Sequence, residues 1–387
     1  MRGLYLSSFV LLVASASSSV KRGLSSSSIF DKSVLTFTRF NCAFPFCPTT
    51  SLDVCAMDEH YEIGRPHILA TLIPQTTTAD MIFFAYSAFD NSTRMHYTLA
   101  ARTLNGDAVN QLFTVSIAMN GTSGALVATS EVVFPQSAAQ ADITYLFTYN
   151  GLVYISFKSG ALLAVSPQTG AVTDTITYLP PGMVGSLACS FDVATATFWA
   201  NAEGTDGFYL TSTSVATNAT SKVGPLPPTP TTGAGPNNAR EDSAVAQLII
   251  RPPPTDARGA AGDLRILELR TSPLFPWLFF AYIDPVTGAS TEVPFPDEWY
   301  EDWDIDPNVF PTQWPGSQRR VWDFDSVNQR GWFKFYDECG GVDDCDENET
   351  IIYFTTNPES EEFFYVAVEP VEPQLTQLLW TPTSQIE

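Results

Sequence analysis

The stretch Leu163–Val172, LAVSPQTGAV, is informative about the fold, because its pattern occurs in two other places along the chain. An apolar run enters a turn in which Pro167 presets φ and Gly170 supplies the positive φ that reverses the chain. Similar turns are found in Asn120–Ala125 (NGTSGA) and Asp284–Ala289 (DPVTGA). Each turn follows one apolar run and precedes another, so the sequence predicts a repeated pair of β-strands.

A second pattern repeats with a longer period. Phe-Asp, a polar stretch and an aromatic run follow one another at Phe89–Asp90, Phe191–Asp192 and Phe324–Asp325. The first two copies are 102 residues apart, and Asp142 lies midway between them. Such spacing indicates a unit of about 45–50 residues with about four strands, which is the size of a propeller blade.

The rest of the chain supports an all-β fold. Short apolar runs end at Gly, Pro, Asn or Asp, as in Leu152–Phe157 and Ile351–Phe354. No segment keeps a 3.6-residue period, and 28 prolines disfavour long helices. The length and pattern therefore predict one β-propeller of six or seven four-stranded blades; two β-sandwich domains are the alternative.

Two of these stretches resemble a known group of proteins. Leu163–Val172 and Phe191–Trp199 (FDVATATFW) are similar to strands of secreted quinoprotein-like or YVTN-type β-propellers. The resemblance covers about half of the chain and implies a fold rather than an activity. In such a propeller the N- and C-terminal strands close one blade, and Val34–Phe40 with Phe363–Val368 are the candidates for that pairing.

The N-terminus reads as a signal peptide over residues 1–16. Arg2 precedes an apolar core, Leu4–Val13, and the small residues Ala14–Ala16 follow it. We expect a flexible Ser-rich stretch over 17–28, then the propeller domain over 29–387 with a Pro-rich loop at 224–238. The predicted location is therefore secreted or extracellular, by way of the secretory pathway.

Charge narrows the range of partners. The formal net charge of −23 at pH 7 repels phosphate backbones and anionic lipid headgroups. We therefore expect no nucleic-acid partner and no direct membrane insertion. Cations and basic partners are favoured, and the oligomeric state stays open.

Cysteines and sequons fit an oxidising compartment. Six cysteines are consistent with disulfides, and the short acidic loop between Cys339 and Cys345 predicts that pair. The other four allow three pairings, and Cys189, in an apolar context, is also a candidate buried thiol. Four sequons predict N-glycans on Asn91, Asn120, Asn218 and Asn348.

One acidic and aromatic segment is the candidate binding region. Oxygen-bearing side chains at every second position predict a calcium site, with Asp302, Asp304, Asp306 and Asn308 as ligands. Pro307 replaces the usual glycine of such loops, and an exposed acidic segment is the alternative. Aromatic side chains in the same segment suit a sugar or a basic peptide, with a plug between blades as the alternative, and the binding candidates are Trp299, Tyr300, Trp303 and Trp314.

No catalytic motif emerges from the sequence. It contains no nucleophile elbow, phosphate-binding loop or dinucleotide fingerprint. A glycosidase needs two carboxylates at a defined separation, and in a sequence with 42 acidic residues the presence of candidates does not indicate this activity. The candidates are Asp90, Asp192, Asp297, Glu298, Asp323 and Asp325. The first hypothesis is a secreted module that binds an extracellular protein or glycan. An extracellular hydrolase or lyase, with calcium-assisted chemistry, and a subunit of an extracellular filament or coat are the alternatives.

Overall fold

The computed structural model describes the strands of the chain and part of their connections. The described ranges are 33–41, 51–57, 67–74, 82–104, 106–135, 143–226, 244–250, 265–271, 278–293, 322–325, 330–337, 348–357, 362–371 and 375–382. Within these ranges all regular structure is β, as the abundance of Val, Phe, Tyr and Thr in short runs predicts.

The described strands form six four-stranded antiparallel sheets, and the strands of each run in order from the innermost to the outermost. The first contains β24 (Leu375–Pro382), β1 (Ser33–Asn41), β2 (Ser51–Met57) and β3 (His67–Ile73). The second contains β4 (Ile82–Asp90), β5 (Met95–Leu104), β6 (Asp107–Ile117) and β7 (Gly124–Glu131). The third contains β8 (Ile143–Tyr149), β9 (Leu152–Phe157), β10 (Ala161–Val165) and β11 (Val172–Thr177).

The remaining three sheets follow the same strand order. The fourth contains β12 (Val184–Asp192), β13 (Thr197–Gly204), β14 (Gly207–Ser214) and β15 (Ala219–Val223). The fifth contains β16 (Ala244–Ile250), β17 (Arg265–Thr271), β18 (Leu278–Ile283) and β19 (Ser290–Val293). The sixth contains β20 (Trp322–Asp325), β21 (Arg330–Asp337), β22 (Asn348–Asn357) and β23 (Glu362–Val371).

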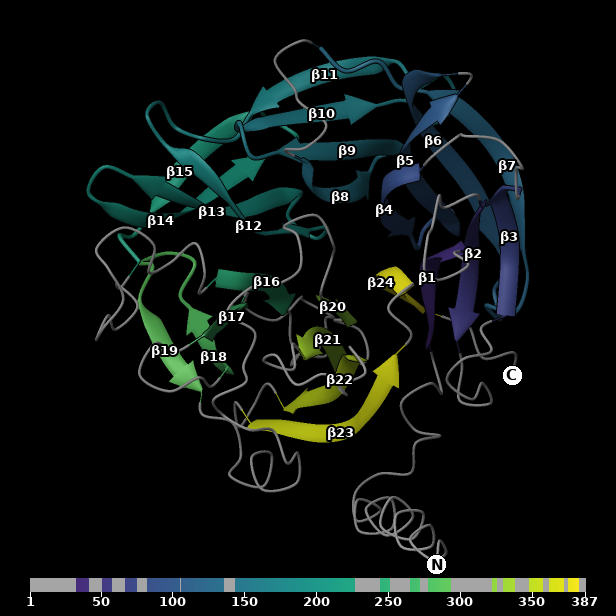
Figure 1. The fold of residues 1–387 in the computed structure, drawn as a ribbon. Coiled ribbons are helices and arrows are strands. Elements are labelled where there is room, and N and C mark those ends of the chain that lie inside the picture. Colours follow the sequence, from purple (N-terminus) through teal and green to yellow (C-terminus); the bar gives the residue numbers. More distant parts are fainter. Residues whose placement is uncertain are drawn as a thin grey trace, which may run out of the picture.

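The innermost strands make a closed ring (Figure 1). Each contacts the next in the order β24, β4, β8, β12, β16 and β20, and β20 returns to β24. Four-stranded sheets arranged in this way around an axis are the blades of a β-propeller. The predicted propeller is therefore confirmed, and the described strands account for six of its blades.

The two ends of the chain close the first blade. β1 pairs antiparallel with β24, so Ser33 lies opposite Pro382. The predicted closure is thus confirmed, but the predicted partner strand is wrong, because Phe363–Val368 belongs to β23, the outermost strand of the last blade. Both segments are apolar runs of strand length, and only the order of the strands around the ring tells them apart.

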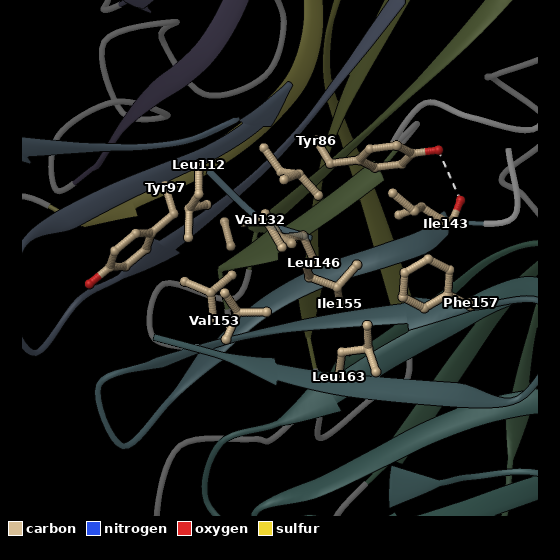
Figure 2. Packing of buried hydrophobic residues seen from close by; sticks show 13 residues of the cluster. Tyr86, Tyr97, Leu112, Val132, Ile143, Leu146, Val153, Ile155, Phe157 and Leu163 are labelled. Atoms are coloured by element: carbon tan, nitrogen blue, oxygen red, sulfur yellow. Dashed lines mark hydrogen bonds between the residues drawn. The ribbon is translucent and has the colours of Figure 1, made fainter. Parts of the chain in front are cut away.

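Alternating side chains build the core between blades. On β4, Tyr86 and Ala88 pack in a cluster with Leu146 and Ile155 of the third blade (Figure 2). Ala85, from the other face of β4, packs with residues of the first blade in a second cluster. Both faces of an inner strand are therefore buried, as a ring of stacked sheets requires.

The two repeated motifs occupy fixed positions in the blades. The Pro-Thr-Gly type of turn joins the third and fourth strands at 166–171 and at 284–289. The Phe-Asp motif ends the innermost strands β4, β12 and β20. Asp142 lies outside the described residues, and the matching position in the third blade is the turn at Asn150–Gly151. The Phe-Asp motif therefore marks the same position in three blades, whereas Asp142 does not mark that position in the third blade.

The order of the strands gives every blade two different ends. The "turn end" of a blade is the end at which the first strand connects to the second and the third strand connects to the fourth. The "crossover end" is where the second strand joins the third and where the chain passes to the next blade. Because the sheets twist, the turn between the third and fourth strands of one blade packs against the outermost strand of the preceding blade. Gly124, for example, lies against Leu69 of β3.

Candidate functional site

The connections that carry the predicted binding residues start and finish at the crossover end. β19 ends at Val293 and β20 begins at Trp322; β21 ends at Asp337 and β22 begins at Asn348. The predicted site residues themselves lie outside the described residues: Trp299, Tyr300, Asp302, Trp303, Asp304, Asp306, Asn308, Trp314, Cys339 and Cys345. The calcium site, the aromatic patch and the disulfide therefore stay predictions.

Three of the four predicted glycosylation positions lie at the turn end. Asn91 is in the turn between β4 and β5, Asn120 between β6 and β7, and Asn218 between β14 and β15. All three are exposed. Asn348 differs, because it is the first residue of β22 and so lies at the crossover end. The sequons are therefore distributed unevenly between the two ends of the blades.

Two of the turns that contain sequons are joined by one arginine. In the second blade, the Arg94 guanidinium donates to Asn91 Oδ1 and to the carbonyl of Ala118, each at 3.1 Å. The same guanidinium lies 4.9 Å from the centre of the Phe89 ring, a cation–π distance. These contacts hold the loops of Asn91 and Asn120 side by side at the turn end.

Two of the six cysteines can be placed. Cys55 and Cys189 are both buried, and neither forms a disulfide. Burial raises the pKa of the Cys55 thiol to about 12, with the Arg39 charge acting against that rise and Asp53 adding to it. The candidate assignment of Cys189 as a buried thiol is confirmed. Cys55 is likewise a buried thiol in this structure, and because Cys42 and Cys47 lie outside the described residues, the three pairings of these four cysteines stay predictions.

Two of the carboxylates considered for catalysis, Asp90 and Asp192, hold turns together. Asp90 Oδ1 accepts from the backbone nitrogen and hydroxyl of Ser92, at 2.9 and 2.7 Å. Asp192 is buried and accepts from the backbone nitrogen of Ala194 and the hydroxyl of Thr195. These bonds are Asx turns of the kind that end a strand and reverse the chain. Asp90 and Asp192 therefore have a structural role.

A buried chain of polar side chains crosses from the first blade to the second, and sequence reasoning missed it. Thr38 Oγ1 lies 2.8 Å from Ser87 Oγ, which lies 3.2 Å from Thr98 Oγ1. Thr98 Oγ1 lies 3.4 Å from His96 Nδ1. All four side chains are buried, and His96 Nε2 is buried without a hydrogen-bond partner. This row of polar side chains links the first blade, which contains strands from both termini, to the second blade.

His96 is a neutral imidazole in this setting. Complete burial lowers the pKa of His96 from its usual 6.5 to about 3. A buried imidazole with this pKa does not carry a proton at neutral pH, so it cannot act there as a general acid. Of the three histidines in the sequence, His96 is a packed core residue, and His60 lies outside the described residues.

Two general features of the described ranges bear on function. No three His, Cys, Asp or Glu side chains there lie close enough together to hold a metal ion. The described part of the chain also contains no helix of the length and apolarity needed to cross a membrane.

The chain is similar to several solved structures at the level of the fold. Neither a protein-family model nor a curated protein matches it. A putative 6-phosphogluconolactonase from Bacteroides fragilis is 8% identical, with 89% of this chain and 84% of that chain covered and a TM-score of 0.44. The periplasmic gluconolactonase PpgL of Pseudomonas aeruginosa is 11% identical, with 90% of this chain and 99% of that chain covered and a TM-score of 0.42. A putative TolB from Agrobacterium tumefaciens is 10% identical, with 89% of this chain and 91% of that chain covered and a TM-score of 0.40.

These solved structures are of the β-propeller type. The assignment of the fold to this chain rests on its own strand order and on its closed ring of inner strands. No activity is carried over from the similar structures, because a propeller scaffold supports many unrelated functions.

Proposed function

We propose that the protein is a secreted glycoprotein that binds an extracellular protein through the crossover end of its last two blades. The observation that carries this proposal is that the connections richest in acidic residues start and finish at the same end of the blades. The segments 294–321 and 338–347 both join strand ends at the crossover end, and together they contain eleven carboxylates and two arginines. A strongly acidic region on one end of a rigid scaffold attracts a basic protein surface.

The aromatic residues of the same segment give the proposed interface its anchors. Trp299, Tyr300, Trp303 and Trp314 are of the residue types that dominate binding energy at protein interfaces. The proposed calcium ligands Asp302, Asp304, Asp306 and Asn308 lie among them in sequence, and a bound Ca²⁺ would fix this segment for binding. Affinity in this proposal comes from the aromatic anchors, and the carboxylates set the rate of encounter and its salt dependence.

The position of the sequons supports the choice of end. A glycan is bulky and solvated, so a surface that carries several of them is a poor docking surface for a protein. Asn91, Asn120 and Asn218 lie at the turn end, and Asn348 is the one predicted position of the four at the crossover end. A protein partner therefore has freer access to the crossover end.

The fourth blade offers a matched pair of variants to test this proposal, because single substitutions create a new sequon at either end of β13. Glu203→Asn creates Asn-Gly-Thr over residues 203–205 at the crossover end, and Val193→Asn creates Asn-Ala-Thr over 193–195 at the turn end. Both side chains are exposed, so neither change disturbs the core. We expect the added glycan at the crossover end to lower binding at least tenfold and the one at the turn end to leave it within twofold.

Binding is measured with tagged secreted protein on intact cells and deposited matrix of the source organism. Captured proteins are identified and then measured again with purified components. The wild type is measured as well after chelation and after return of Ca²⁺, and we expect chelation to weaken binding. A partner that tolerates the glycan at the crossover end but not the one at the turn end contradicts the proposed interface. Failure of the chain to leave the cell contradicts secretion itself.

A further inference from the structure

The outermost strand of the second blade, β7, is an exposed and largely apolar edge. It is the last strand of its sheet, so one row of its backbone groups lacks a neighbouring strand. Leu126 and Val127 are 41% and 58% exposed, and Met119, in the turn that leads to β7, is 52% exposed. An exposed edge strand with apolar side chains is a template for pairing with another chain.

β7 lacks the charges that usually protect such an edge. Its one charged residue, Glu131, is the last of the strand. That end is already covered, because Gly170 of the next blade packs directly on the Glu131 backbone and Ser130 Oγ donates to the Pro167 carbonyl at 3.2 Å. The open part of the edge is therefore 125–129, which contains no charge. The outermost strand β15, by contrast, carries Lys222 within a five-residue strand.

A sequon occupies the turn that leads into this open edge. Asn120 lies four positions before Gly124, the first residue of β7. The Asn120 Oδ1 atom accepts from the backbone nitrogen of Thr122 at 3.2 Å, and Gly121 takes a positive φ of 71°. No described hydrogen bond engages Asn120 Nδ2, the atom to which an N-glycan is attached. The turn thus holds the amide with its oxygen bound inward and its nitrogen available.

We propose that an N-glycan on Asn120 covers the open edge of β7 and takes the place of the missing charged residue. This inference rests on the proposed secretion and glycosylation of the chain. In the modification, Asn120 Nδ2 forms a bond to the anomeric carbon of a lipid-pyrophosphate-linked oligosaccharide. The bond from that carbon to the pyrophosphate breaks, the amide loses one proton, and the lipid pyrophosphate leaves. The glycan then keeps two copies of the chain from pairing edge to edge through β7.

Two substitutions at one position separate the glycan from the turn. Thr122→Ala destroys the sequon but keeps Asn120 and the backbone nitrogen that donates to it, whereas Thr122→Ser keeps the sequon. In protein secreted from a eukaryotic host, we expect the alanine variant to lose the mass of one glycan and to form dimers or larger species as its concentration rises. The serine variant stays monomeric. Adding Val127→Lys to the alanine variant restores the monomer.

Two further measurements make the outcome decisive. Trimming the glycans of the folded wild-type protein with an endoglycosidase is expected to produce the same association without any mutation. Asn218→Gln, which removes the sequon beside β15 and its Lys222, is expected to leave the protein monomeric. A modified Asn120 whose loss leaves a monomer at every concentration overturns the shielding role. An exported protein with Asn120 unmodified overturns the site, whereas absence of export overturns the proposed function beneath it.

Discussion

Replacing Gly170 with alanine is expected to lower the free energy of unfolding by about 3 kcal/mol. Gly170 has a φ of +72°, which costs an L-residue roughly 1–2 kcal/mol. A Cβ atom there would also lie 1.9 Å from the Glu131 carbonyl oxygen, and relieving such overpacking costs about 1–3 kcal/mol. The loss arises at the contact between the second and third blades, where backbone meets backbone and no side chain can move aside.

Gly151→Ala is the matched control for this prediction. Gly151 has nearly the same φ, +74°, but a Cβ atom there meets nothing within 4 Å. We therefore expect it to cost only the conformational part, about 1–2 kcal/mol. Urea unfolding of both variants measures the difference. Equal losses would show that the turn of the third blade does not press against β7.

Acid is expected to destabilise the fold through His96, by about 2 kcal/mol between pH 7 and pH 5. The folded protein holds His96 with a pKa of about 3, whereas the unfolded chain has the usual value of 6.5. Below pH 6.5, His96 therefore binds a proton in the unfolded chain but stays neutral in the folded protein. The stability is fully present above pH 6.5 and decreases as the pH falls toward 3.

His96→Gln separates this effect from the titration of carboxylates. The variant lacks the imidazole, so its free energy of unfolding is expected to fall about 2 kcal/mol less than that of the wild type between pH 7 and pH 5. Both proteins contain the same 42 acidic residues, whose contribution cancels in the comparison. Urea unfolding at pH 7, 6 and 5 measures it. Parallel pH profiles for the two proteins would contradict the burial of a neutral imidazole between the first two blades.

Local features of the fold were predictable from the sequence, because they depend on neighbouring residues. Pro167 and Gly170 specify a turn wherever they occur together, and the four-strand unit follows from the spacing of such turns. Exposure of Asn91, Asn120 and Asn218 follows in the same way from their turn residues. Each of these predictions needs only a short window of sequence.

Features that depend on distant contacts were not predictable. Thr38 and Ser87 are 49 positions apart, and nothing near either residue indicates that they meet. Cys55 lies in a run that looks like any other strand, so its burial depends on the packing of the blade around it. The choice of β24 rather than β23 as the partner of β1 depends on the order of the strands around the whole ring. The candidate binding segments share this limit, because sequence gives their composition but not the end of the blade from which they leave.

The distinction between the turn end and the crossover end depends on the closed ring of innermost strands. Cross-linking with a short bismaleimide tests it directly, in a variant that carries Val34→Cys and Thr381→Cys. These residues are direct partners in the pairing of β1 with β24. Of the six native cysteines, Cys55 and Cys189 are buried and compete little for the reagent, and the control variant contains the same six.

We predict a cross-linked peptide that joins residues 34 and 381 in high yield in the native protein and disappears in denaturant. We predict no such peptide in the control variant Val34→Cys with Phe364→Cys, because Phe364 lies on β23 at the outer edge of the last blade. A cross-link between residues 34 and 364, with none between 34 and 381, would contradict the closure by β24 and with it the assignment of the two ends.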